Sequence, residues 1–299
     1  MLRYALLRAA MLAASIAGAG LLAAAIAALG QPGAVAGVAD FLAAMLAKVP
    51  NVFAFNIGQS SLSGLSASIE AGPAFMASLE LLLFAIPIAL IIGVPLGSAL
   101  ADPATRPIVS PIVQLTGSVP VFCAGLLIGI LLARLWPAHT GNDVPSLFAA
   151  IASQDSNTML AALEAIAPPG LTVGLAGAGA VALSWRNALE IASAEPYRDG
   201  LRRLGLGEAD ILRIYVVRHA IALSLADLAD IVLAFFAAAA VAEWIFAWPG
   251  AGAAFIHAVA LADWAVAAVI VFVIAIIRAG ADFAGPVAAH ALIAEEAAS

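Results

Sequence analysis

The side chains with most potential for chemistry are the ionisable residues inside long apolar stretches. Asp227 and Asp230 lie in one such stretch, and Arg278 and Asp282 lie in another. Residues three or four apart share one face of a helix. We therefore expect an ion pair between Arg278 and Asp282. For Asp227 and Asp230 two interpretations stay open: they line a proton- or cation-coupled path, or they lie near the cytoplasmic mouth of a pathway.

The sequence lacks the residue patterns that usually support nucleotide hydrolysis or metal binding. A phosphate-binding loop needs a Gly-Lys pair followed by Ser or Thr, and the chain's single lysine, Lys48, stands between Ala47 and Val49. The four histidines are scattered without the spacing of metal ligands. We expect no catalytic residue, no metal ion and no cofactor on this chain.

The elements that position these residues must lie in lipid. The chain has 299 residues, of which 64% are hydrophobic and 10% charged. An ordinary soluble domain is about 45–50% apolar and about 25% charged. Such hydrophobicity excludes a disordered chain, and the net charge of -7 argues against binding to nucleic acid. A single cysteine, Cys123, excludes an internal disulfide framework.

A helix needs about 20 mostly apolar residues to cross a bilayer. The stretches that meet this requirement are roughly 9–29, 79–100, 111–133, 169–189, 220–242 and 265–285. The first is longer than the apolar core of a signal peptide, which is about 7–15 residues, so we expect it to remain uncleaved. We predict an all-α integral membrane protein with six transmembrane helices in one domain over residues 1–299.

The basic residues predict the orientation, because cytoplasmic loops carry an excess of Lys and Arg. With the N-terminus inside, only Lys48 and Arg134 of the twelve basic residues fall outside. Both termini are then cytoplasmic. The outer loop 30–78 includes a short amphipathic helix over 40–48, and the longest inner loop spans 190–219.

This inner loop has the pattern of a helix, a glycine and a second helix. Glu195 suits the first turn of a helix, and Arg202 and Arg203 suit its last turn. Gly205 then falls just past the helix end, where glycine is favoured. A second, separate helix is expected over 208–218. A charged unit of this kind suits docking to a cytoplasmic partner.

The same loop resembles that of binding-protein-dependent ABC importer permeases, in particular the first permease of the dipeptide, oligopeptide and nickel branch. The positions that match the branch's pattern are Tyr197, Arg202, Gly205, Leu206, Arg218 and His219. A second match is the run Glu243-Trp-Ile-Phe-Ala-Trp-Pro-Gly-Ala-Gly252, which resembles the family's Glu-x-x-Phe-x-Trp-Pro-Gly-x-Gly. Weaker matches occur at 56–60, 93–97 and 118–122. The chain departs from the pattern at Leu201 and Leu204, where the family has Ala and Lys, and it lacks the family's proline between His219 and Glu243.

The resemblance implies a type I ABC importer fold in the bacterial inner membrane, with this chain forming half of a path for peptides or a similar small solute. It implies a second homologous permease, two ATPase subunits that carry ATP and Mg, and an extracytoplasmic binding protein. The residues implied in coupling to the ATPase are Glu195, Tyr197, Asp199, Gly200, Arg202, Arg203, Gly205 and Leu206. Those implied in an outer hairpin or gate are Glu243, Phe246, Trp248, Pro249, Gly250 and Gly252. Candidate path residues are Ser118, Pro120, Phe122, Asp227 and Asp230.

Two other functional classes remain open at this point. One is a secondary transporter that uses Asp227 and Asp230 for ion coupling, and the other is a membrane scaffold without a path. Arg202 and Arg203 likewise either pair with acidic groups of an ATPase or form a solvated positive face. Uptake that requires ATP hydrolysis by a co-purifying subunit distinguishes the importer from the alternatives.

Overall fold

A computed structural model describes residues 2–31, 37–111, 146–194 and 197–296, together with Cys123, Leu127 and Leu131. Within these residues the regular elements are helices, and one isolated antiparallel bridge joins Gln59 to Ser66. The predicted all-α class is therefore confirmed.

Five helices in the described ranges are long and apolar enough to cross a bilayer. They are α1 (Leu2–Ala28), α3 (Ala67–Ala101), α7 (Ser156–Ala194), α11 (Leu228–Ile245) and α13 (Trp264–Glu296). They coincide with five of the six predicted spans. The remaining predicted span, 111–133, lies outside the described residues except for Pro111, Cys123, Leu127 and Leu131.

Several of these helices are longer than the sequence predicts. Helix α7 has 39 residues, which corresponds to about 58 Å against a hydrocarbon core of about 30 Å. The predicted span begins only at 169, because it covers just the apolar stretch. Pro168 and Pro169 are inside the helix, so α7 continues beyond the apolar layer.

The fifth span differs from its predicted form. Helix α9 (Glu208–Asp210) continues through the π-helical segment η2 (Ile211–Val216) into α10 (Val217–Ala226). The predicted helix over 208–218 is therefore present, but its predicted end at 218 is wrong, because the chain stays helical into the membrane. The break comes instead at Asp227, whose backbone (φ -87°, ψ 6°) separates α10 from α11.

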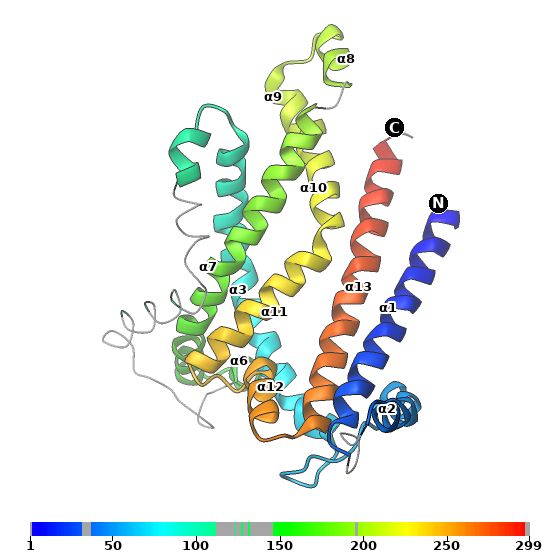
Figure 1. Cartoon of the computed structure of the whole chain (residues 1–299). Helices are drawn as coiled ribbons and strands as arrows, with labels where there is room; N and C mark the ends of the chain where they lie inside the picture. Colours follow the sequence, from blue (N-terminus) through cyan, green and yellow to red (C-terminus); the bar gives the residue numbers. More distant parts are fainter. Residues whose placement is uncertain are drawn as a thin grey trace.

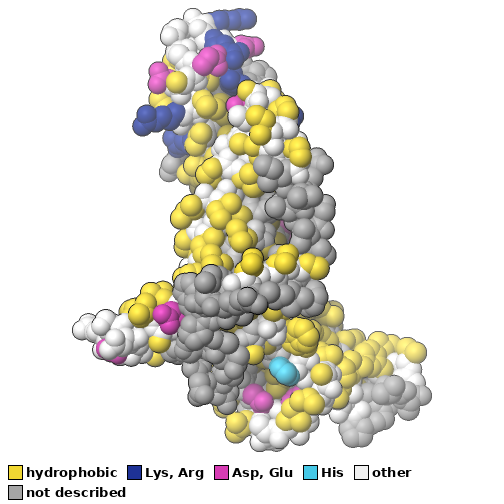
Figure 2. Space-filling model, turned by 90° about the vertical axis from the view of Figure 1, so that its left-hand side faces the viewer, with side chains coloured by type: hydrophobic (Ala, Val, Ile, Leu, Met, Phe, Trp, Pro, Cys, Tyr) yellow, Lys and Arg dark blue, Asp and Glu magenta, His cyan; other side chains and the backbone are white. Residues whose placement is uncertain are grey.

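Short helices lie at the two ends of the bundle (Figure 1). One end holds α2 (Val38–Phe53), α6 (Leu147–Ser153) and α12 (Ala251–Ala260), and the other holds α8 (Tyr197–Arg203) with α9. Both chain termini lie toward the α8 end. Helix α2 confirms the predicted helix over 40–48 and extends it at both ends. On the face shown in Figure 2, Lys and Arg side chains gather at the α8 end.

Close packing joins the helices into two neighbouring groups. Helices α1 and α13 share an apolar core with α2, and α3, α7 and α11 share another. The α3–α7 contact depends on glycine: a Cβ at Gly93 would lie 2.7 Å from the Ala178 carbonyl oxygen, and one at Gly97 would lie 2.5 Å from that of Ala182. Small residues at these positions let the two backbones approach closely.

Candidate outer hairpin, coupling loop and path

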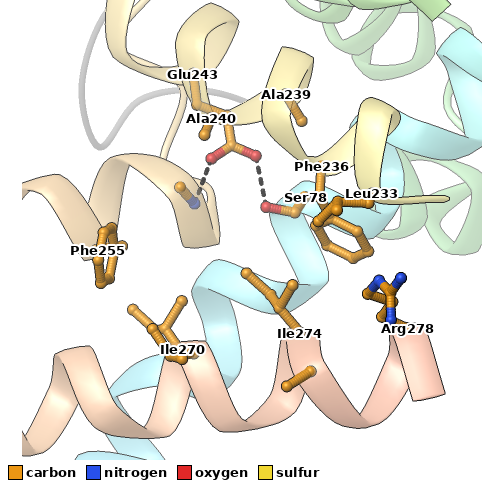
Figure 3. Close-up of a pocket in the computed structure, with 13 residues that line it drawn as sticks. Ser78, Leu233, Phe236, Ala239, Ala240, Glu243, Phe255, Ile270, Ile274 and Arg278 are labelled. Atoms are coloured by element: carbon orange, nitrogen blue, oxygen red, sulfur yellow. Dashed lines mark hydrogen bonds between the residues drawn. The ribbon is translucent and has the colours of Figure 1, made fainter. Parts of the chain in front are cut away.

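The predicted outer hairpin is organised around one buried carboxylate. Glu243, at the end of α11, is fully buried and accepts hydrogen bonds from the backbone N–H groups of Gly252 (2.7 Å) and Ala253 (3.1 Å). The Ser78 hydroxyl of α3 donates to its other oxygen at 2.5 Å. Figure 3 shows this arrangement. Because a helix N-terminus presents unpaired N–H groups, Glu243 caps α12 and ties it to α3 and α11.

The other hairpin residues support the same contact. Trp248 is buried, and its indole N–H donates to the Ala77 carbonyl at 2.9 Å. A Cβ at Gly250 would lie 2.1 Å from Cδ of Glu243, and a Cβ at Gly252 would lie 2.3 Å from Cα of Ala240. Phe246 packs partly buried against the α3–α7–α11 core, whereas Pro249 is exposed. The structure thus brings together Glu243, Trp248 and both glycines.

Two further buried carboxylates act in the same way at this end, and neither is among the predicted site residues. Glu80 of α3 accepts from the N–H groups of Leu147 and Phe148 at 3.1 Å each and so caps α6. Asp263 precedes α13 and accepts from the Ser60 hydroxyl and from the Val266 N–H at 3.4 Å. Glu80 is the one charged residue of the predicted span 79–100 and lies at its start. This position was the sequence signal that could have identified it as a functional carboxylate.

At the opposite end, the predicted coupling helix is present as α8, which is closed onto α9 by ion pairs. Glu208 accepts from Arg198 (3.2 Å) and from two nitrogens of Arg202, and Arg202 also pairs with Asp199 at 3.0 Å. The hydrogen bond from Arg202 lowers the pKa of Glu208 and raises that of the guanidinium. Arg202 is therefore engaged within the loop, an arrangement that neither sequence-based interpretation included.

Gly205 ends α8 as predicted. Its φ of +83° lies in the left-handed region that favours glycine. The Gly205 N–H donates to the Arg202 carbonyl at 3.0 Å, and the Leu206 N–H donates to the Leu201 carbonyl at 3.2 Å. These two bonds form a Schellman motif, in which an apolar contact normally accompanies the turn. Leu201 and Leu206 both pack on the same small core, which accounts for the leucine at 201.

That small core anchors the loop to the bundle. Ala188, Leu189 and Ala192 of α7 pack against Ile211 and Val216 of η2, with Ala220 of α10. The outward face of the loop presents Arg203, Gly200 and Leu204, and Leu204 is 78% exposed. Glu195 lies outside the described residues, as does the side chain of Tyr197, whose backbone begins α8.

The structure describes some of the predicted path residues and leaves the others outside the described ranges. Ser118, Pro120 and Phe122 lie outside the described residues. Asp227 accepts a hydrogen bond from the Ser184 hydroxyl at 2.8 Å. Asp230 pairs with Arg278 of α13 at 3.5 Å.

The predicted pair between Arg278 and Asp282 is therefore corrected. Arg278 pairs across the helix interface with Asp230 because α13 packs beside α11, and a cross-helix carboxylate competes with the one on its own helix. Spacing along one helix cannot reveal such a partner.

A cavity of about 260 Å³ adjoins this ion pair. Its walls come from α3, α11, α12 and α13, with Glu243 at one end and Arg278 at the other (Figure 3). The other lining residues are mainly apolar and include Leu233, Phe236, Phe255, Ile270 and Ile274.

Residues 85–284, which include α8, the outer hairpin and the cavity wall except for Ser78, match the family described as the binding-protein-dependent transport system inner membrane component. The chain belongs to this family. It is also 30% identical over 223 residues to the probable D,D-dipeptide transport system permease protein DdpB of Escherichia coli strain K12, a match that covers 69% of this chain and 65% of the relative. The match thus spans just under two thirds of the relative's length.

Family membership confirms the type I permease fold and the location in the inner membrane that the sequence predicts. The similarity to this probable D,D-dipeptide permease confirms the resemblance to the dipeptide branch. The comparisons give no support to an ion-coupled secondary transporter.

Proposed function

We propose that this chain is one of two permease subunits of an ATP-driven importer for a dipeptide or a similar small solute. The observation that carries the proposal is the continuous connection from α8 to the membrane. The loop is closed on α9 by Glu208, and α9 runs without a break through η2 and α10 to Asp227. A force applied to α8 therefore reaches the middle of the fifth span.

The partner subunits supply what this chain lacks. Two ATPase subunits bind ATP and Mg and dock on α8, a second permease completes the path, and an extracytoplasmic binding protein delivers the solute. Exposed Leu204 and Arg203 suit an apolar groove with acidic groups at its edge. Catalysis of ATP hydrolysis belongs to the ATPase subunits.

The proposed orientation places α8 and both termini in the cytoplasm. Arg198, Arg202 and Arg203 lie in α8, and cytoplasmic segments are enriched in such residues. Figure 1 places both termini toward the same end. The hairpin with α12 then faces the binding protein.

The proposed coupling is a rigid-body movement. Closure of the ATPase pair moves α8 together with α9, η2 and α10, and the break at Asp227 lets α11 tilt relative to α10. Because Glu243 ties α11 to α12 and α3, this tilt moves the outer hairpin. Opening of the path to either side would follow.

The experiment that tests this function is uptake by the reconstituted importer. The complex is assembled in liposomes with its ATPase subunits, and dialanine is supplied with the binding protein. We expect uptake that requires ATP hydrolysis and stops when the ATPase subunits are omitted. Uptake by the isolated chain driven by an ion gradient would overturn the proposal.

A further inference from the structure

Two oppositely charged side chains lie within apolar helices. Along α13, Arg278 is about 21 Å from Trp264 and about 22 Å from Ile293 at 1.5 Å per residue. Asp230 lies in the first turn of α11, directly after the break at Asp227. Both side chains thus belong to helices long and apolar enough to cross a membrane, where ionisable groups are costly and mark functional pathways.

The pair is open to its surroundings instead of being enclosed by this chain. The Asp230 side chain is 81% exposed and that of Arg278 is 44% exposed. Hydrocarbon offers no hydrogen-bond donors to a carboxylate so exposed. The exposed pair is accessible from the path between the two permeases that the proposed function requires.

The ion pair is also loosely made. The nitrogen–oxygen distance of 3.5 Å exceeds the roughly 2.7–2.9 Å of a strong charge-assisted hydrogen bond. Both groups thus keep hydrogen-bonding capacity for a third molecule. Asp227, three residues earlier, is exposed as well and adds a second carboxylate to this region.

The adjoining cavity supplies an apolar wall. Leu233, Phe236 and Ile274 line it between Arg278 and Glu243. Both oxygens of Glu243 are already engaged by Ser78, Gly252 and Ala253. Among the described residues that line the cavity, Arg278 is thus the charged group with capacity for a ligand.

We propose that Arg278 and Asp230 form a solute site for a zwitterionic peptide inside the path, an inference that rests on the proposed function. The guanidinium of Arg278 binds the carboxylate of the solute. Asp230, with Asp227 beside it, binds the ammonium group, and the cavity accommodates an apolar side chain. In the empty path the two residues pair with each other, and the zwitterion replaces that pair with two new ones.

The test uses the complete importer in liposomes, with dialanine as the probe and with dialanine taken up per ATP hydrolysed as the readout. We expect Arg278→Gln and Asp230→Asn each to lower this ratio about tenfold or more. Stimulation of ATP hydrolysis by the loaded binding protein stays within about twofold of wild type, since it reports assembly and coupling. Arg186→Gln, which removes a helical ion pair with Glu190, is the matched control and keeps the ratio within about twofold.

The double variant Arg278→Gln/Asp230→Asn separates a solute site from a structural ion pair. It leaves no unpaired charge in the bilayer, so a purely structural pair predicts recovery of uptake. The solute site predicts that uptake per ATP stays low. Recovery in the double variant, or unchanged uptake in both single variants, would overturn the site while leaving the proposed function intact. Absence of ATP-dependent uptake in the wild-type importer would overturn both.

Discussion

Ser78 and Glu243 are 165 residues apart in the chain and share a hydrogen bond of 2.5 Å in the buried interior. The same serine oxygen accepts the Ala251 N–H at 2.7 Å. One serine and one glutamate thus join α3, α11 and the start of α12. This contact defines the position of the outer hairpin relative to the wall of the cavity.

Removing the Glu243 carboxylate should destabilise the protein. Glu243→Ala leaves the Gly252 and Ala253 N–H groups and the Ser78 hydroxyl without their acceptor, and each buried unsatisfied group costs about 1–3 kcal/mol. We expect a lower thermal midpoint in detergent, measured by tryptophan fluorescence. Asp40→Asn, an exposed carboxylate of α2, is the control. Equal midpoints for the two variants would contradict this role of Glu243.

Gly252 should not tolerate a methyl group. In Gly252→Ala the new Cβ would lie 2.3 Å from the backbone of Ala240, and overpacking of this kind typically costs about 1–3 kcal/mol. Gly179→Ala in α7 is the matched control, because its Cβ meets nothing within 4 Å. We expect a lower thermal midpoint for Gly252→Ala and an unchanged or higher one for Gly179→Ala. The reverse order would show that α11 and α12 are not so closely packed.

The closure of α8 on α9 should depend on pH in a defined direction. The pKa of Glu208 is lowered from 4.5 by the hydrogen bond from Arg202. Because the folded-state pKa is lowered, the contribution to stability is complete above pH 4.5 and is lost as the pH falls through the lower value. Spin labels at positions 203 and 210 should report a constant distance from neutral pH to 4.5 and separation only below it.

The control for that titration is Glu208→Gln. This variant lacks the charge that holds Arg198 and Arg202, so the label distance should be long at neutral pH and change little with acid. A transition that persists in Glu208→Gln would assign the pH dependence to another group.

The local features of the α8 loop and of the outer hairpin could be predicted from the sequence. The last turn of α8 and its glycine follow from charges and a special backbone position, both of which act within a few residues. The hairpin run from Glu243 to Gly252 was recognised as a unit, although the capping role of Glu243 was not.

The partners between helices could not be predicted in the same way. Arg278 pairs with Asp230 and Glu80 caps α6 because particular helices pack together, and neither contact leaves a periodic pattern in the sequence. The break at Asp227 was also hidden, since neither a proline nor a glycine marks it. Tertiary contacts determine these features.

The most direct test of the account is the effect of Gly205→Pro on ATP hydrolysis by the assembled importer. Proline fixes φ near -65°, which is incompatible with the +83° at this position, so the end of α8 must change. Gly207→Ala is the matched control, because its φ of -69° suits any residue.

We predict that the loaded binding protein no longer stimulates ATP hydrolysis in Gly205→Pro, whereas stimulation in Gly207→Ala equals that of wild type. Full stimulation and full uptake with Gly205→Pro would contradict the assignment of α8 as the coupling element.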